Sequence, residues 1–127
     1  GSGSVHVYEY DSVTDVWVNT EFLRSPDWYW DDQFGSSLAI SGDLLVVGGD
    51  DSTYVYERDG SGNWVLLAEL LDGDTSLGAS SVDIIGTTVA VALPYCWVGD
   101  ISKAGSVLTY DLSSFPSGWN TTPAIIV

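Results

Sequence analysis

Two loops of the sequence bring aromatic and acidic side chains together. Residues 27–32 have the sequence Asp-Trp-Tyr-Trp-Asp-Asp, and a second long loop covers residues 94–103. Aromatic rings can stack on sugar rings or anchor a protein partner, and carboxylates accept hydrogen bonds from hydroxyl groups. The alternative is that these rings pack into gaps between sheets, although a consecutive Trp-Tyr-Trp run cannot bury all its rings on one side. The candidate residues for binding a ligand or partner are Trp28, Tyr29, Trp30, Asp31, Asp32, Tyr95 and Trp97.

The sequence offers few residues for metal binding or catalysis. Asp72 and Asp74 could bind a cation weakly, and calcium is the natural choice for carboxylate oxygens. Residues 59–63, Asp-Gly-Ser-Gly-Asn, also alternate oxygen-bearing side chains, but a β-turn explains them better. The chain has one histidine, one cysteine and three basic residues, so neither a Ser-His-Asp triad nor a histidine metal site can be assembled. We therefore expect no catalytic residue, and no cofactor beyond weakly bound calcium.

The charge balance excludes several classes of partner. The 127 residues include 18 acidic and 3 basic side chains, which gives a net charge of -15. Such a chain repels the phosphates of nucleic acids and of anionic membranes, and no run approaches the roughly 18 apolar residues of a membrane helix. The acidity is typical of a solvated surface in a salty or extracellular medium, and cation binding is the alternative interpretation. Asn120 opens an Asn-Thr-Thr sequon, a candidate glycosylation site if a eukaryotic cell secretes the protein.

The elements that position these loops are β-strands. Apolar residues alternate with a period of two or form short β-branched runs, and Gly, Asp, Ser and Asn gather between them. The predicted strands are 4–10, 16–23, 35–41, 44–49, 53–56, 64–70, 79–85, 88–92, 106–111 and 124–127. Short strands at this spacing, with no convincing helix between them, predict an all-β fold.

The strands recur along the chain. Residues 3–8, Gly-Ser-Val-His-Val-Tyr, return at 105–110 as Gly-Ser-Val-Leu-Thr-Tyr, and residues 53–56 lie halfway between. Residues 34–43 align in the same way with residues 77–86. A period of about fifty residues that holds four strands is typical of a β-propeller.

A tryptophan follows each tyrosine-containing strand after a polar turn. These residues are Trp17, Trp64 and Trp119. Because they recur with the repeat, we expect them to pack in the core or along a sheet edge.

The order of these motifs resembles the FG-GAP repeat. Phe34-Gly35 begins an apolar strand, Ser-Gly-Asp forms a turn, Val-Val-Gly-Gly follows, and a tyrosine strand and a tryptophan complete the order. FG-GAP repeats build the propeller of integrin α-subunits and of many secreted proteins, so the resemblance implies an extracellular or cell-surface location. Integrin-type repeats carry an Asp-rich calcium loop between their first two strands. The corresponding hairpins here, residues 41–43 and 86–87, are too short to wrap a cation with roughly six to eight oxygens.

The expected fold class is therefore all-β, built from four-stranded antiparallel meanders that form about two and a half propeller blades in an incomplete ring. Within a single segment, 1–127, residues 3–23 supply the outer half of one blade and residues 34–71 a full blade. Residues 78–127 supply another full blade with a weak last strand. Since propellers usually close with about four to eight blades, we expect the rest of a larger chain, or other subunits, to complete the ring.

These features predict a non-catalytic module for extracellular recognition, adhesion or structural assembly. In a meander blade the loops that enter the first strand and join the second to the third share one side, so the acidic and aromatic loops should form one face toward a protein or a glycan. The alternative is a propeller that scaffolds a larger secreted enzyme, a hydrolase or lyase, whose catalytic domain lies outside this chain. Neither nucleic acid binding nor membrane insertion is expected.

Overall fold

The protein forms ten β-strands in the residues that the computed structural model describes, which are 3–26, 33–50, 52–70, 81–94, 100–101, 105–113 and 124–126. The strands are β1 (Ser4–Asp11), β2 (Val16–Arg24), β3 (Ser37–Ser41), β4 (Leu44–Gly48), β5 (Thr53–Arg58), β6 (Trp64–Leu70), β7 (Ser81–Ile85), β8 (Thr88–Leu93), β9 (Ser106–Asp111) and β10 (Ala124–Ile126). No helix long and apolar enough to cross a membrane is found in these described segments. The predicted all-β fold is confirmed.

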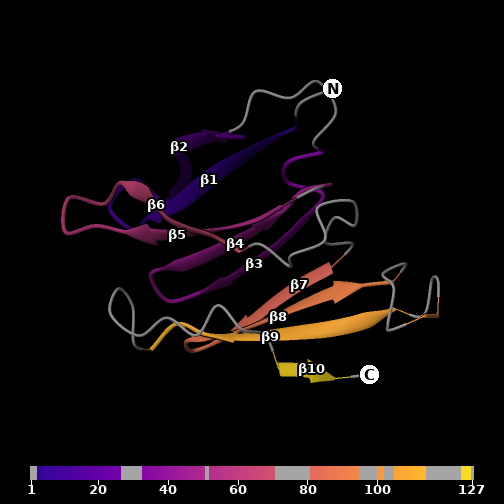
Figure 1. Ribbon diagram of the computed structural model, residues 1–127. Helices are drawn as coiled ribbons and strands as arrows, with labels where there is room; N and C mark the ends of the chain where they lie inside the picture. The colour runs from indigo at the N-terminus through magenta and orange to yellow at the C-terminus, as the bar shows by residue number, and fades with distance from the viewer. Residues whose placement is uncertain are drawn as a thin grey trace.

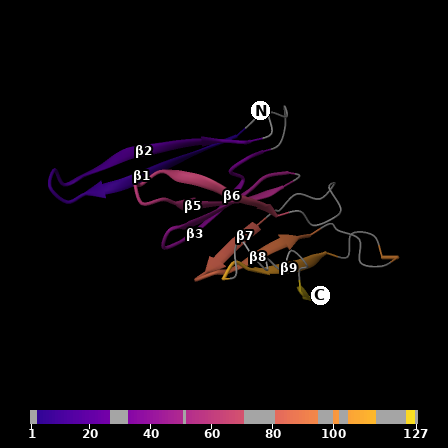
Figure 2. The same cartoon turned by 60° about the vertical axis from the view of Figure 1, so that its left-hand side comes forward.

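The strands form three antiparallel sheets. Strands β1 and β2 pair with each other, β3–β4–β5–β6 form a meander, and β7–β8–β9–β10 form a second meander. Figures 1 and 2 show the sheets stacked as three layers, with β3–β6 in the middle. Meanders packed face to face in this way are consistent with the partial propeller blades that the sequence predicts.

The two central strands of the middle sheet, β4 and β5, are buried on both faces, and this explains their sequences. Val46 lies opposite Val55, and Val47 lies opposite Tyr54; all four side chains are buried. Side chains along a strand point alternately to opposite faces, so Val46 and Val55 face one neighbouring sheet while Val47 and Tyr54 face the other. A strand covered on both sides cannot alternate apolar and polar residues, and β4 and β5 accordingly have nearly continuous apolar runs.

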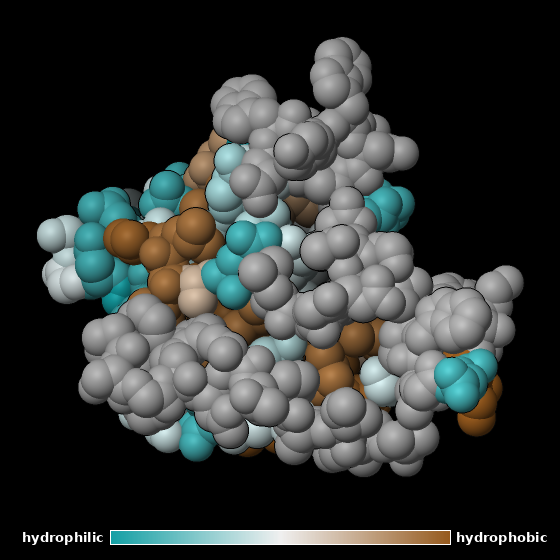
Figure 3. Space-filling view, viewed as in Figure 1, coloured by the Kyte–Doolittle hydropathy of each residue, from teal (hydrophilic) through white to brown (hydrophobic). Residues whose placement is uncertain are grey.

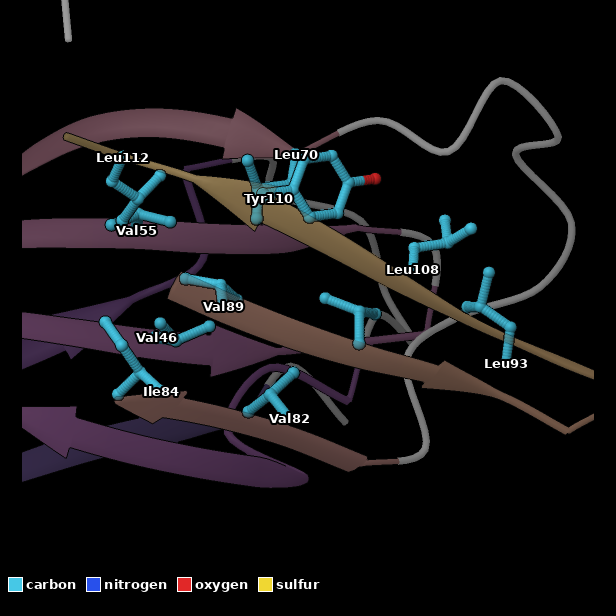
Figure 4. Close-up of a cluster of buried hydrophobic side chains, with 11 residues drawn as sticks. Val46, Val55, Leu70, Val82, Ile84, Val89, Leu93, Leu108, Tyr110 and Leu112 are labelled. Carbon is cyan, nitrogen blue, oxygen red and sulfur yellow. The ribbon is translucent and has the colours of Figure 1, made fainter. Parts of the chain in front are cut away.

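One apolar cluster joins the middle sheet to β7–β9. Figure 4 shows valines from β4 and β5 directed at side chains of β7, β8 and β9. The buried members are Val46, Val55, Leu70, Val82, Ile84, Val89, Val91, Leu93, Leu108, Tyr110 and Leu112. This cluster is an interface between two sheets.

A second cluster joins the middle sheet to β1–β2. Phe34, which precedes β3, is almost completely buried there, with its ring centroid 5.6 Å from that of Tyr54 and 6.4 Å from that of Tyr56. Tilted and edge-on ring pairs at such distances are favourable beyond the area that they bury. The other buried members are Val5, Leu23, Leu45, Val47 and Trp64.

Two glycines allow the backbone of β1 to approach the segment around Phe34. A methyl group on Gly3 would overlap the carbonyl oxygen of Phe34. Gly35 has a φ of +89°, which side chains rarely tolerate, and its N–H donates a hydrogen bond of 3.0 Å to the carbonyl of Gly48. The start of β1, the start of β3 and the end of β4 are therefore fixed against one another.

The hairpins β3–β4 and β7–β8 have two-residue turns, so both are short, as the sequence predicts. Each turn begins with a glycine of positive φ, +57° at Gly42 and +60° at Gly86. The two glycines are therefore equivalent, which places Ile40 in the position of Ile84. The sequence alignment of residues 34–43 with residues 77–86 pairs each residue with a neighbour of its structural equivalent. That alignment is therefore wrong by one residue along these strands, because the turn glycines set the register.

An aspartate at the end of each tyrosine strand, or directly after it, closes a turn. The Asp11 carboxylate accepts a hydrogen bond from the N–H of Val13 at 2.9 Å, and the Asp59 carboxylate accepts one from the N–H of Ser61 at 2.8 Å. Asp111 and Ser113 repeat the pattern at 2.9 Å. The backbone hydrogen bonds hold the pKa of Asp11 and of Asp111 below the usual value. Residues 59–63 form a β-turn, as the sequence predicts.

The close approach at Gly3 gives a prediction about stability. Gly3→Ala should lower the free energy of unfolding by about 1–3 kcal/mol, since a backbone carbonyl must move to admit the new methyl group. Urea denaturation followed by tryptophan fluorescence measures the change. Gly60→Ala is the matched control, because open space surrounds Gly60 and its φ is not positive. Equal midpoints for the two variants would contradict the packing described for Gly3.

Burial of Tyr56 predicts how alkali affects the protein. Desolvation, with a smaller contribution from Tyr54, raises the pKa of Tyr56 from 10.0 to about 12. A group whose pKa is raised on folding stabilises the protein below the unfolded pKa, and this contribution is lost as the pH rises from 10 toward about 12. Tyr56→Phe should therefore unfold at a higher pH than the unmodified protein in a circular dichroism titration. Tyr8→Phe, at an exposed position, should not; identical shifts in both variants would refute the assignment.

Candidate binding surface

The loop residues predicted to bind a ligand or a partner lie outside the described residues, and their role stays a prediction. They are Trp28, Tyr29, Trp30, Asp31, Asp32, Tyr95 and Trp97; the same holds for Asp72, Asp74 and Asn120. The structure does describe the strand ends next to these loops. There the Gln33 amide donates a hydrogen bond of 2.6 Å to Asp50, and the Ser52 hydroxyl donates one of 2.5 Å to Glu69.

One face of β1–β2 carries an exposed set of aromatic rings. Residues that lie opposite each other on antiparallel strands share a face, which groups His6 with Phe22 and Tyr10 with Trp17. The ring centroids are 4.6 Å apart in the first pair and 5.6 Å apart in the second. We call His6, Tyr8, Tyr10, Trp17 and Phe22 the aromatic face; all five side chains are exposed.

The Arg24 guanidinium lies at one end of the aromatic face, 4.9 Å above the centre of the Phe22 ring. A cation at this distance over an aromatic ring is attracted to it. The face therefore combines apolar rings with a positive charge, which is unusual in a chain with three basic residues.

The aromatic face exists because β1 alternates two kinds of side chain. Val5 and Val7 alternate with His6 and Tyr8, and Val5 packs with Leu23 against the middle sheet. With the valines directed inward, the rings must point the other way. The sequence contained this signal in the alternation at residues 5–10, although Tyr8 and Tyr10 could also be explained as members of a repeated strand.

The middle sheet has an equivalent face, but there it is buried. Tyr56 occupies the position of Tyr8 in the repeat, and Trp64 lies opposite Arg58 as Trp17 lies opposite Tyr10. Trp64 is 7% exposed and Trp17 is 69% exposed. The buried position of Trp64 matches the expectation of packing, whereas for Trp17 that expectation is wrong because no described sheet covers its face. The equivalent face of the middle sheet thus packs against another sheet, while the aromatic face of β1–β2 is exposed.

Exposed apolar side chains also occur elsewhere. Figure 3 shows apolar surface on the side of the molecule where Figure 1 places β6, and Val65 and Leu66 of this strand are about half exposed. These two aliphatic side chains form no ring pairs, so exposure alone does not make them a candidate site.

Arg58 connects two sheets and a turn. Its guanidinium forms ion pairs with Glu9 of β1 and, at 3.2 Å, with Asp43 of the β3–β4 turn. The backbone N–H of Arg58 also donates a hydrogen bond of 2.8 Å to the backbone carbonyl of Asp43.

Within the described segments, no three His, Cys, Asp or Glu side chains lie close enough together to hold a metal ion. The described surface thus offers ring contacts and carboxylates as its means of binding.

The difference between the two equivalent tryptophans can be tested. Trp64→Ala should lower the free energy of unfolding by about 3–5 kcal/mol, because it removes a buried ring from the interface between sheets. Trp17→Ala should lower it by less than about 1 kcal/mol, since Trp17 is exposed and its described ring contact is the one with Tyr10. Chemical denaturation of both variants measures the two effects, and a comparable loss at the two positions would show that Trp17 is buried in solution.

Residues 17–63 match the family model for the FG-GAP repeat. The match begins at Trp17 in β2, includes β3, β4 and β5, and ends just before β6. No curated protein and no solved structure gave a match.

Proposed function

From the FG-GAP repeat at residues 17–63, we propose that the protein is a non-catalytic, extracellular module for recognition and assembly. It binds a protein through sheet surfaces such as the aromatic face, and it presents its acidic, aromatic loops to a protein or a glycan. FG-GAP repeats are typically non-catalytic propeller modules and occur in extracellular and cell-surface proteins. The match itself supports a propeller-like recognition or scaffold module.

The observation that carries this proposal is the aromatic face together with its buried counterpart. The chain buries Tyr54, Tyr56 and Trp64 against another sheet, and it exposes the same kind of surface on β1–β2. Aromatic residues near arginine are the side chains that contribute most to protein interfaces. A protein partner with an apolar β-sheet surface therefore fits the aromatic face better than a small ligand.

The loops add a second surface to the proposal. Trp28, Tyr29, Trp30, Tyr95 and Trp97 would supply the rings, and Asp31 and Asp32 would accept hydrogen bonds. Asp50 and Glu69, at the described ends of the neighbouring strands, would extend the acidic character of this surface. Asp72 and Asp74 would hold at most a loosely bound calcium ion, and Asn120 would carry a glycan if the protein is secreted by a eukaryotic cell.

A panel of tryptophan variants tests the proposal. Trp30→Ala and Trp97→Ala for the loops, and Trp17→Ala for the aromatic face, should each weaken retention on a binding partner about tenfold or more, as truncation of an interface anchor does. Retention is measured on immobilised glycans and extracellular matrix proteins. Melting temperatures should change little, with Trp64→Ala as the comparator for a buried ring. Retention that falls only in step with the melting temperature would assign these residues to packing instead.

A further inference from the structure

Two valines of β2 stay exposed although they lie on the side of β1–β2 that faces the middle sheet. Val7, Glu9 and Asp11 alternate along β1, and Val7 packs against the cluster that joins the two sheets. Val18 lies opposite Glu9, and Val16 lies opposite Asp11, so both valines share this side. Val16 is nevertheless 50% exposed and Val18 is 43% exposed.

Leu66 of β6 is the corresponding side chain on the middle sheet. It lies opposite Tyr56, which is buried against β1–β2, so Leu66 lies on the surface that faces the two valines. Leu66 is 43% exposed. Its neighbour Val65 lies opposite Glu57 and therefore belongs to the other face of the sheet.

An ion pair crosses between the two surfaces beside these side chains. Arg58 of β5 contacts Glu9 of β1, the cross-strand neighbour of Val18. Figures 1 and 2 both place β1–β2 beside β5 and β6. The exposed aliphatic side chains thus belong to one region, on facing sheets, and we call Val16, Val18 and Leu66 the outer rim.

The charge around the outer rim is negative. Asp11 shares the face of Val16, and Glu21 shares it as the cross-strand neighbour of Val7. Arg58 does not offset these charges, because its guanidinium is already paired with two other carboxylates. The outer rim therefore offers aliphatic contacts next to carboxylates, a combination that the aromatic face does not have.

We propose that the outer rim is a docking site for a short extended segment of a partner protein, one that combines valine or leucine with lysine or arginine. The aliphatic side chains of the segment cover Val18 and Leu66, and its basic side chains lie near Asp11 and Glu21. The inference rests on the recognition role proposed above, and it adds a separate surface and the chemistry of the segment that this surface takes.

The chemistry of the outer rim favours this occupant over others. Carboxylates attract a basic segment and repel the phosphates of nucleic acids and of anionic membranes. A second copy of the chain is a poor partner, because it brings 18 acidic residues and only three basic ones. A glycan has no aliphatic side chain with which to cover Val18 and Leu66.

The test compares two labelled peptides of about ten residues that differ only in their apolar positions. One alternates valine with lysine, since alternate side chains of an extended segment point to opposite sides, and the other alternates serine with lysine. The valine peptide should bind the full chain saturably and about tenfold more tightly than the serine peptide. Added salt should weaken the binding of both peptides, because it screens exposed charges.

Variants of the chain locate the site. Val18→Thr and Leu66→Thr should each weaken binding of the valine peptide about fivefold to tenfold, with little change in melting temperature because both positions are exposed. Glu21→Gln should weaken it about threefold, as loss of an exposed charge pair does. Val65→Thr is the matched control, since Val65 lies on the same strand and is 51% exposed but faces the other way; it should bind like the unmodified protein.

Several results would overturn the inference. Equal affinity for the two peptides would reduce the contact to charge attraction, and equal affinity of the Val18, Leu66 and Val65 variants would place the peptide elsewhere. Trp17→Ala and Trp30→Ala should bind the peptide normally, so failure of the outer rim can be told apart from failure of the aromatic face and of the loop surface. Binding that is lost only in Trp17→Ala would assign the peptide to the aromatic face instead.

Discussion

Burial of the central strands β4 and β5 on both faces of the middle sheet is the constraint on which the rest of the structure depends. Val46 and Val55 serve one interface, while Val47 and Tyr54 serve the other. A shift of one residue in the pairing of β4 with β5 would exchange the two sets and mismatch both interfaces at once. Two backbone hydrogen bonds close this pairing at its two ends, from the N–H of Gly49 to the carbonyl of Ser52 at 2.9 Å and from the N–H of Arg58 to the carbonyl of Asp43 at 2.8 Å.

The strands and the class of fold could be predicted because they depend on local alternation and on turn residues. Burial of individual residues could not, since it depends on whether another sheet covers the face. Trp17 and Trp64 occupy equivalent positions in the repeat, yet one is exposed and the other is buried. The same holds for Ile40 and Ile84. Periodicity shows which side of a strand a residue occupies, and only the arrangement of sheets shows what lies on that side.

The candidate surface also has a part that the sequence predicts and a part that it does not predict. The aromatic loops could be recognised from composition, and they remain a prediction. The aromatic face was harder to recognise because its tyrosines also mark the repeat, and the same tyrosines serve packing in β5. A short alternation of valine with aromatic residues predicts two chemically different faces, but it does not tell which of them is covered.

The acidic composition and the exposed sheet surfaces have opposite effects on association. Exposed edges and apolar faces promote indiscriminate pairing of sheets, whereas a net charge of -15 makes copies of the chain repel one another. Arg58 moderates this repulsion locally by holding Glu9 and Asp43 together. Exposed ion pairs of this kind add little stability, on the order of 1 kcal/mol or less, so packing between the sheets remains the dominant source of order.

The two faces of each sheet also bear on how such a chain can change length during evolution. At both interfaces, the tyrosine-bearing face of one sheet meets the valine-bearing face of the sheet before it. The stack therefore has a direction. The middle sheet contacts the sheet before it through its tyrosine-bearing face and the sheet after it through its valine-bearing face. Duplication or deletion of one whole repeat would join surfaces that already fit, whereas a change of half a repeat would bring unmatched faces together. Repeat number can therefore vary in whole steps while each interface keeps its chemistry.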